Sequence, residues 1–424
     1  MKKTACLLAS LMMLLGNTAF AQNYTPGTYV GESGGRNGVV KVEAEYSADA
    51  IVSAKVIEHS ETPGISDAPI AQLPEEYVKY QSLGLDVISG ATLTSNAILA
   101  ALEQTAAAAG ADVEALKAVP VEAKTAGEDE VLSADIVVVG AGGAGLAAAV
   151  SASEQGASVI VLEKTVAVGG NTLRSGGWYN SADQERQKNL EMSEAQKATV
   201  EAMLAKEAVN EKMAQLQQTL QTEWDAYKAE GGTYLFDSPT FHALQTYDGG
   251  DYLGNIDLIA EYANEAPNTL KWLESLGMQT NPTVTMCVGA LWQRSHSVVG
   301  NTNVGYGYIE TVHRAAEEKG VQILFETRGT ELMTDENNAV IGVRAEKSDG
   351  TKLTVNAAKG VILATGGFGG DLDKVREIRS DIPETIKTTS SSACTGDGIW
   401  MAQAIGAEAI DLDQIQLYPL ASAV

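Results

Sequence analysis

Three glycines spaced as G-x-G-x-x-G are the strongest chemical signal in this chain. Gly140, Gly142 and Gly145 follow an apolar run at 135–139, and an acidic residue, Glu163, ends the next apolar run. Glycine in such a turn lets a pyrophosphate approach the backbone, and an acidic side chain about twenty residues later can accept hydrogen bonds from ribose hydroxyls. The spacing therefore predicts a site for a dinucleotide.

A second group of small residues precedes an alanine-rich helix expected over 96–109. The stretch from Asp86 to Ser95 reads D-V-I-S-G-A-T-L-T-S. Small residues allow close approach of a ligand, and the free N–H groups of a first helical turn favour a phosphate. A threonine in this stretch could esterify such a phosphate. Alternatively, Thr92 serves only to cap the helix.

The charge balance argues against nucleic acid as a partner. The chain has 424 residues, with 29 Lys and Arg against 55 Asp and Glu, and its formal charge is −26. A surface of this composition repels phosphate backbones and anionic lipid. The length and the 45% hydrophobic content allow more than one hydrophobic core, so we expect several domains.

The N-terminus has the residue order of a secretory signal peptide. Lys2 and Lys3 precede an apolar run at 5–15, and an A-x-A-like end follows at 19–21. Cleavage after this end would leave Gln22 as the first residue of an exported, for example periplasmic, protein. A buried N-terminal helix is the alternative. No later stretch reaches the apolar length that a membrane span requires.

The cysteines and histidines give no support for a metal or haem site. The chain has four histidines and three cysteines, and the sequence contains no C-x-x-C-H and no paired Cys or His spacing. Cys6 would leave with the signal peptide. A disulfide between Cys287 and Cys394 stays open, because export permits a disulfide without requiring one.

Two short motifs in the first hundred residues resemble the FMN-binding domain family. They are H-x-E-T-P-G at 59–64 and D-x-x-S-G-A-T-x-T at 86–94. The resemblance implies that FMN is bound covalently through a phosphoester to Thr92, with Thr94 as the second choice. It also implies a separate flavin transferase as a partner, and an electron-relay role for the attached flavin.

The dinucleotide motif and three later segments resemble the soluble fumarate reductase and urocanate reductase flavoproteins. The segments are 169–177, 361–368 and 395–398. The resemblance implies FAD, held without a covalent bond because Asn171 and Thr172 stand where membrane-bound relatives carry a histidine. The residues assigned to FAD in this way are Gly140, Gly142, Ala144, Gly145, Glu163, Lys164, Gly170, Asn171, Thr172, Gly176, Gly177, Ala364, Thr365, Gly366 and Asp397.

These resemblances imply an α/β protein. A small α+β FMN-binding module precedes a Rossmann-like FAD-binding domain, which carries an inserted α+β capping domain and an apparently truncated C-terminus. Within one insertion, apolar residues from Leu190 to Trp224 are spaced as a single helical stripe. The expected boundaries are 1–21 for the signal peptide, 22–110 for the FMN-binding domain, 111–130 for a linker, 131–236 for the first part of the FAD-binding domain with a helical insertion at 184–230, 237–355 for the capping domain and 356–424 for the second part.

Two residues bear on the substrate through the same resemblance. His296, in the expected capping domain, either lies near substrate or serves as a structural hydrogen-bond partner. Tyr418 stands in Q-x-Y-P, where fumarate reductases carry a histidine that binds a carboxylate, and this replacement resembles the urocanate reductases. A tyrosine ring and hydroxyl suit a neutral heteroaromatic better than an anion. Alternatively, Tyr418 only packs beside the isoalloxazine.

The expected function follows from the family. It is transfer of a hydride from FAD to the C=C bond of an α,β-unsaturated carboxylate, with electrons entering from an external donor through FMN. Urocanate is the first expectation and fumarate the second. A flavin electron carrier without its own substrate, or an oxidase or dehydrogenase of the same fold, are the alternatives. The family's proton-donating arginine would lie beyond Val424.

Overall fold

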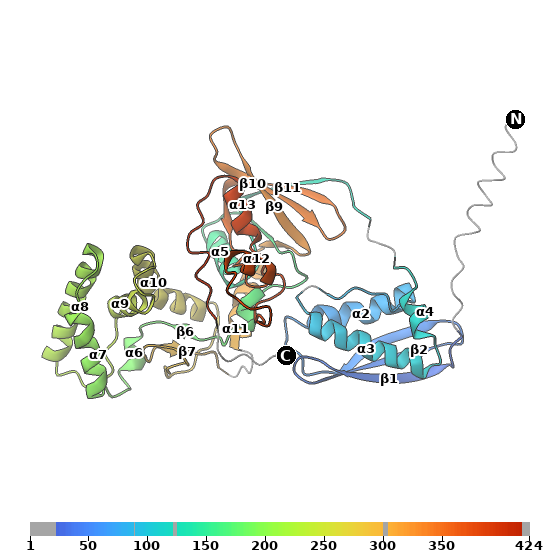
Figure 1. The fold of residues 1–424 in the computed structure, drawn as a ribbon, viewed down its shortest axis with the longest axis horizontal. Helices are drawn as coiled ribbons and strands as arrows, with labels where there is room; N and C mark the ends of the chain where they lie inside the picture. The colour runs from blue at the N-terminus through green and yellow to red at the C-terminus, as the bar shows by residue number, and fades with distance from the viewer. Residues whose placement is uncertain (1–22, 89, 122–124, 300–303, 418–424) are drawn as a thin grey trace. The chain divides into compact units, whose positions relative to one another are not determined.

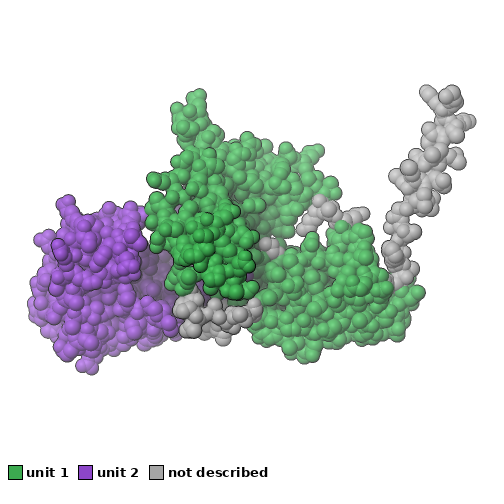
Figure 2. Space-filling model, viewed as in Figure 1, with its two compact units in different colours: residues 1–141, 158–170, 323–424 green, residues 142–157, 171–322 purple. Residues whose placement is uncertain are grey.

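The computed structural model describes residues 23–88, 90–121, 125–299 and 304–417 (Figure 1). The predicted signal peptide therefore lies outside the described residues. The chain divides into two compact units, coloured separately in Figure 2. The first unit comprises Met1–Ala141, Ser158–Gly170 and Ile323–Val424, and the second unit comprises Gly142–Ala157 and Asn171–Gln322.

The N-terminal module of the first unit is an antiparallel sheet with two helices packed on it (Figure 1). Along the middle strand, alternate residues such as Val40 and Val42 are buried, while Lys41 and Glu43 on the other face are not. The module's elements are β1 (Gly27–Gly34), β2 (Val39–Tyr46), β3 (Ile51–Glu58), α2 (Asp67–Tyr80), α3 (Thr92–Ala108) and α4 (Val113–Lys117).

Helix α3 packs unusually close to strand β1. A β-carbon on Gly31 would lie 2.1 Å from the Ala101 carbonyl oxygen, so only glycine permits this approach. Ile98 and Leu102 of the same helix are fully buried in the module's core. The buried Tyr46 hydroxyl lies 2.7 Å from the Thr105 hydroxyl, which gives a polar group inside this core a partner.

Two elements in this part of the chain differ from the sequence-based expectations. Helix α3 begins at Thr92, four residues before the expected start at 96. The expected linker at 111–130 contains helix α4, whose N-terminus is capped by the Asp112 carboxylate accepting from Ala115 N at 3.1 Å.

A six-stranded sheet forms the other part of the first unit, with the strand order β8-β5-β4-β11-β10-β9. The strand before the glycine-rich turn, β4, pairs in parallel with both β5 and β11, and β9, β10 and β11 pair antiparallel. The strands are β4 (Glu130–Val139), β5 (Val159–Leu162), β8 (Gln322–Leu324), β9 (Thr327–Thr334), β10 (Val340–Lys347) and β11 (Lys352–Leu363).

The six-stranded sheet includes residues that the sequence-based prediction assigned to the capping domain, whose expected end was residue 355. Residues 327–355, expected in the capping domain, lie in β9, β10 and the start of β11. Consecutive strands joined by short turns pair with one another, and β11 then pairs with β4 from much earlier in the chain. The pairing with β4 is a long-range contact that no local pattern signals.

The second unit is mostly helical (Figure 1). The single stripe expected over 190–224 is divided between two helices, because Ser193 begins one with a capping box and Asn210 caps the next. Both share one core with later helices, so the insertion at 184–230 belongs to this unit. The elements, in chain order, are α5 (Gly143–Glu154), the 3-10 turn η1 (Gly170–Arg174), β6 (Tyr179–Asn180), α6 (Gln184–Gln187), α7 (Glu194–Ala205), α8 (Glu211–Ala229), α9 (Pro239–Gly249), α10 (Ile256–Ser275), β7 (Ser295–His296) and α11 (Val304–Glu318).

Two short helices, α12 (Leu372–Ile378) and α13 (Asp397–Ala404), follow the last strand of the first unit. Cys287 and Cys394 are both free, so the structure contains no disulfide between them. Among the described residues, no helix has the length and apolar character to cross a bilayer. The same ranges contain no cluster of three or more His, Cys, Asp or Glu side chains suited to a metal ion.

Candidate functional site

The first turn of α3 presents the predicted phosphate-bearing threonine to solvent. Thr92 is the first residue of this 17-residue helix and its side chain is exposed. Ala91 at the N-cap contributes no side-chain hydrogen bond, and the first turn contains no acidic residue. A phosphate on Thr92 would therefore meet the positive end of the helix dipole without a competing anion in that turn.

Thr94, the second candidate, is buried. Its hydroxyl donates a hydrogen bond to the carboxylate of Glu61, which is buried as well. Glu61 lies in the H-x-E-T-P-G segment, and its second oxygen accepts from Asn37 N at 2.8 Å. The two threonines thus differ in accessibility, and only Thr92 offers an exposed hydroxyl.

In the first unit, the glycine-rich turn passes very close to the end of β11. Gly140 has φ 104°, and a β-carbon there would lie 2.5 Å from the Ala364 carbonyl oxygen. The neighbouring Thr365 hydroxyl accepts a hydrogen bond from Gly398 N at 3.2 Å, and Gly366 has φ 74°. The structure thus brings the first glycine of the motif together with the predicted second and third FAD segments.

Glu163 lies directly after β5, at the carboxyl end of the parallel strands. Its carboxylate accepts from Ala141 N at 2.9 Å and from both the backbone N–H and the hydroxyl of Thr165 at 2.8 Å. The side chain is therefore anchored to the glycine-rich turn. This is the position from which a carboxylate can reach ribose hydroxyls in a dinucleotide fold.

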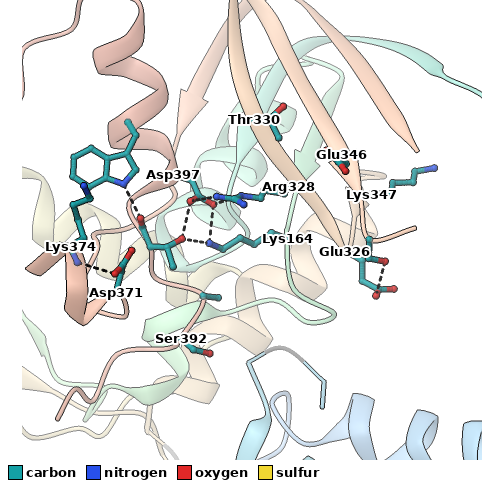
Figure 3. A pocket seen from close by; sticks show the side chains of 14 residues that line it. Lys164, Glu326, Arg328, Thr330, Glu346, Lys347, Asp371, Lys374, Ser392 and Asp397 are labelled. Atoms are coloured by element: carbon teal, nitrogen blue, oxygen red, sulfur yellow. Dashed lines mark hydrogen bonds and ion pairs between the residues drawn. The ribbon is translucent and has the colours of Figure 1, made fainter. Parts of the chain in front are cut away.

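A pocket of about 760 Å³ in the first unit contains Lys164 and Asp397 (Figure 3). Lys164 Nζ lies 2.9 Å from the Asp397 carboxylate and 2.8 Å from the Thr395 hydroxyl. Arg328 of β9 binds the same carboxylate with two nitrogens, at 3.0 and 2.9 Å. Burial raises the pKa of Asp397, but hydrogen bonds from these three partners outweigh it, so the pKa is lowered from its ordinary value.

In the second unit, helix α5 begins directly after Gly142, which is its N-cap. Gly143 N donates to the Thr172 hydroxyl at 3.3 Å, and a β-carbon on Gly143 would lie 2.9 Å from that oxygen. The other residues of this unit that are predicted to bind FAD lie at three places. Ala144 and Gly145 are in the first turn of α5, Asn171 is in η1, and Gly176 and Gly177 follow η1. Gly170, at the start of η1, belongs to the first unit.

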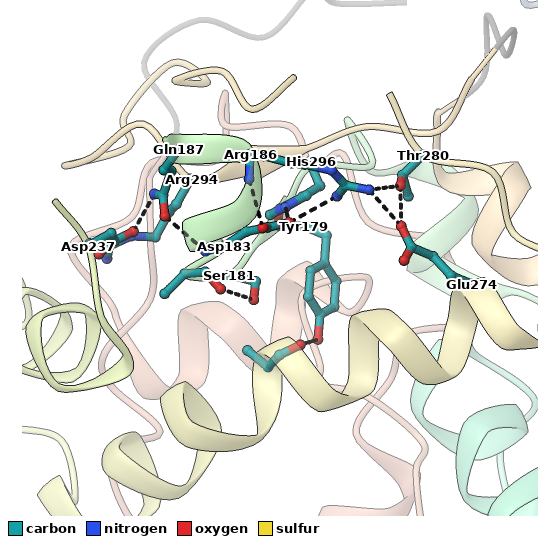
Figure 4. A network of polar contacts seen from close by, with 12 residues as sticks. Tyr179, Ser181, Asp183, Arg186, Gln187, Asp237, Glu274, Thr280, Arg294 and His296 are labelled. Carbon is teal, nitrogen blue, oxygen red and sulfur yellow. Dashed lines mark hydrogen bonds and ion pairs between the residues drawn. The ribbon is translucent and has the colours of Figure 1, made fainter. Parts of the chain in front are cut away.

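His296 lies in β7 and is fully buried in a polar network (Figure 4). One ring nitrogen lies 3.2 Å from the Tyr179 carbonyl oxygen, and the other lies 3.1 Å from the Asp183 carboxylate. Burial raises the pKa of Asp183, but the bonds from His296 and Arg186 outweigh it and the pKa is lowered. Because both ring nitrogens have partners, this geometry favours the structural role of His296 over contact with substrate.

Arg294, two residues earlier, forms a buried ion pair in the same region (Figure 4). Its guanidinium binds Asp237 with two nitrogens, at 3.0 and 2.7 Å, and donates to Gln245 at 2.7 Å. A bidentate pair of this kind fixes the loop before β7 against the start of α9. Tyr418, the other predicted substrate residue, lies outside the described residues.

Several of these residues fit a flavin dinucleotide. The glycine-rich turn leaves no room for a β-carbon at Gly140, and an acidic side chain is anchored beside it at Glu163. Both features follow parallel strands, which is where dinucleotide folds bind their ligands. The fold and these residues define a dinucleotide-binding protein with a second, smaller module.

Comparison with known protein families agrees with this class. A family model described as FAD dependent oxidoreductase matches residues 135–403, and one described as FMN-binding domain matches residues 35–107. The chain therefore belongs to the FAD-dependent oxidoreductases and carries an FMN-binding domain. The predicted family and the mixed α/β fold class with a separate FMN-binding module are confirmed.

Relatives of known activity are similar over most of this chain. It is 35% identical to an NADH:acrylate oxidoreductase of Vibrio harveyi over 94% of this chain, and 30% identical to a urocanate reductase of Eggerthella lenta over 92%. It spans 41% and 57% of the lengths of those two relatives. The open conformation of a flavocytochrome c3 fumarate reductase is similar in structure, with a TM-score of 0.53 and 26% identity over 68% of this chain and 43% of that one.

Two residues of these sites have no assigned role in the sequence-based predictions. Arg328 is the second residue of β9 and reaches Asp397, at the start of α13, only because the strand and the helix meet in the fold. Glu61 stands inside a recognised motif, yet its partner Thr94 is more than thirty residues away in the second motif. Both motifs belong to one small module, and this was the feature of the sequence from which the contact between Glu61 and Thr94 could have been predicted.

Proposed function

We propose that this chain reduces the C=C bond of an α,β-unsaturated carboxylate. The main support is that an FAD-dependent oxidoreductase domain and an FMN-binding domain occur in one chain, which is similar over more than nine tenths of its length to reductases named for acrylate and urocanate. Bound reduced FAD would supply the hydride. The chain's contribution is to hold this flavin through the turn at Gly140, the carboxylate of Glu163 and the charged group around Asp397.

We further propose that FAD is held without a covalent bond and that FMN is esterified to Thr92. Asn171 and Thr172 offer no histidine ring to the FAD region, and Thr92 is exposed at the start of a helix. An esterified flavin stays with the protein during turnover, which suits a relay for electrons from an external donor. A separate flavin transferase would make the bond.

For the substrate, we propose a carboxylate with one anionic group. Tyr418 replaces the histidine that binds a second carboxylate in the resembling fumarate reductases, and a tyrosine carries no positive charge at neutral pH. Urocanate stays the first expectation from this residue. Acrylate is the rival, because it also lacks a second carboxylate and gives its name to a relative.

Anaerobic activity of the complete protein tests the reaction and its substrate. Reduced viologen supplies electrons without the physiological donor, and NADH is offered in a parallel assay because two relatives are named for it. We expect oxidation of the dye with urocanate or acrylate and much slower oxidation with fumarate. No turnover of any enoate would favour an electron carrier instead. Rapid reoxidation of the reduced flavin by oxygen would favour an oxidase.

Acid precipitation tests the two modes of flavin attachment. FAD should appear in the supernatant, while FMN should stay on the peptide that contains Thr92. In the variant Thr92→Ala, FMN should be lost and FAD release should be unchanged, which gives an internal control. FMN in the supernatant of the unchanged protein would contradict the phosphoester.

We also propose export, on the basis of the basic, apolar and small-residue order at 1–21. N-terminal analysis of protein made with its leader should find Gln22 first. Retention of Lys2 and of the protein in the cytoplasm would contradict export. The protein would then have access to the cytoplasmic NADH pool.

A further inference from the structure

The Glu61 carboxylate joins three separate segments of the FMN-binding module. One oxygen accepts from Asn37 N, in the turn between β1 and β2, and the other accepts from the Thr94 hydroxyl in α3. Glu61 itself follows β3. A β-carbon on Gly35 would lie 2.6 Å from the first oxygen, so the turn passes close to this carboxylate.

This carboxylate is buried without a cation. Glu61 is 4% exposed, and among the residues that the structure describes no lysine, arginine or histidine forms an ion pair with it. Burial of a charged group is costly unless hydrogen bonds compensate it. The bonds from Asn37 N and the Thr94 hydroxyl supply this compensation, so the acidic residue and these two donors depend on one another.

The helix geometry shows what the contact does for the neighbouring residues. Successive residues of an α-helix are about 100° apart, so Thr92 lies about 200° around the axis from Thr94. When Glu61 holds Thr94 inward, Thr92 must therefore face outward. Ser95 is also buried, and its hydroxyl donates to the Ala91 carbonyl oxygen at 3.0 Å. Thr92 is left as the exposed hydroxyl of the turn.

We infer that Glu61 is a positioning residue for the covalent attachment of flavin. It sets the rotation of the first turn of α3 so that Thr92 faces the transferase, and it occupies the Thr94 hydroxyl so that this neighbour is not modified. The inference rests on the proposed FMN ester. In that transfer, with FAD as the flavin donor, the Thr92 oxygen bonds to the FMN phosphorus, the pyrophosphate bond breaks, AMP leaves and the hydroxyl proton passes to a base of the transferase.

The test measures the rate and the site of flavin attachment. Full-length protein is made without a flavin transferase, then incubated with purified transferase and FAD, and the peptide from residue 82 onward is followed by mass spectrometry. In Glu61→Ala we expect attachment at least tenfold slower, with part of the FMN on Thr94. Glu61→Gln keeps an oxygen acceptor for Thr94 and should recover most of the rate and the choice of Thr92.

Glu58→Gln is the matched control, because Glu58 ends β3 and its side chain is 62% exposed. It should be modified at the unchanged rate. If Glu61→Ala does not fold, Thr94→Val removes the same hydrogen bond from the other side and should also slow attachment. Attachment of FMN to Thr92 alone, at the unchanged rate, in a folded Glu61→Ala or Thr94→Val would overturn the inference. Absence of FMN on the unchanged protein would instead overturn the proposed ester.

Discussion

At the residue scale, His242 shows how burial sets the charge of a single side chain. It is buried in α9, and its Nδ1 has no hydrogen-bond partner within the described part of the chain. Burial, and then the nearby charge of Arg294, lower its pKa from 6.5 to about 3. The imidazole is therefore neutral in the folded protein throughout the neutral range.

This lowered pKa makes stability depend on pH. Between the folded pKa of about 3 and the unfolded value of 6.5, only the unfolded chain binds a proton at His242. The free energy of unfolding should therefore fall as pH drops through this window, by up to about 1.4 kcal/mol per pH unit from this group. In His242→Gln the fall between pH 6.5 and 4.5 should be smaller, as measured by urea denaturation.

The matched control for this measurement is His313→Gln, because His313 is partly exposed on α11. That variant should keep the pH dependence of the unchanged protein. Identical slopes in all three proteins would show that His242 does not contribute.

Asp397 is the shared anion of the ion pairs with Lys164 and Arg328 in the first unit. Its side chain is 9% exposed and binds Lys164 and Arg328 together. In Asp397→Asn two cations lose their shared anion, so we expect weaker FAD retention and a loss of about 1–3 kcal/mol of stability. Gel filtration followed by flavin analysis measures the retention.

Asp373→Asn provides a comparison, because that aspartate is almost fully exposed and pairs with Arg376 of its own helix. It should retain FAD as the unchanged protein does. Equal retention by both variants would remove Asp397 from the set of residues that support the flavin.

At the element scale, the turn between β4 and α5 needs glycine for two reasons. Gly140 has a positive φ, and it approaches the end of β11 more closely than a β-carbon allows. We expect Gly140→Ala to lower the melting temperature strongly, through about 1–3 kcal/mol of backbone strain and an added steric clash. Circular dichroism during heating measures the change.

Gly156→Ala separates these two causes. Gly156 also has a positive φ, of 80°, but a β-carbon there would meet no atom within 4 Å. It should therefore show the cost of φ alone. If the two variants melt at the same temperature, close approach of the strands does not contribute to the requirement at Gly140.

At the scale of the whole molecule, the FMN-binding module and the six-stranded sheet have separate hydrophobic cores. The two clusters of buried residues share no member. All five tryptophans of the chain lie after residue 177, outside the module. Tryptophan fluorescence therefore follows the later part of the chain, while circular dichroism follows all of it.

Separate cores predict that a core truncation acts on one transition only. Leu102→Ala in α3 should destabilise the module by about 2–5 kcal/mol. In urea, this should shift the dichroism curve but leave the tryptophan fluorescence curve unchanged. Leu162→Ala in β5 is the reciprocal variant and should shift the fluorescence curve. A shift of both curves by Leu102→Ala would mean that the two cores unfold together.

Local patterns were enough to predict the family, the mixed α/β class and the two flavin-binding domains. The glycine motif at 140–145 and the motif at 86–94 each span only a few consecutive residues. The sequence alone is therefore enough to recognise the FAD-binding and FMN-binding domains. The position of α3 differed by four residues, and the stripe at 190–224 became two helices. Side-chain caps at Ser193 and Asn210 decided the boundaries of these two helices, whereas α3 begins without a side-chain cap.

The sequence by itself determined where phosphate-binding segments are expected, because glycine turns and helix N-termini work through the backbone of one short segment. Only the tertiary structure decided that Thr92 is exposed while Thr94 is held by Glu61, and that Arg328 shares Asp397 with Lys164. Those contacts join residues that lie far apart in sequence. Their distances are set by the pairing of strands and the packing of helices, which no local spacing records.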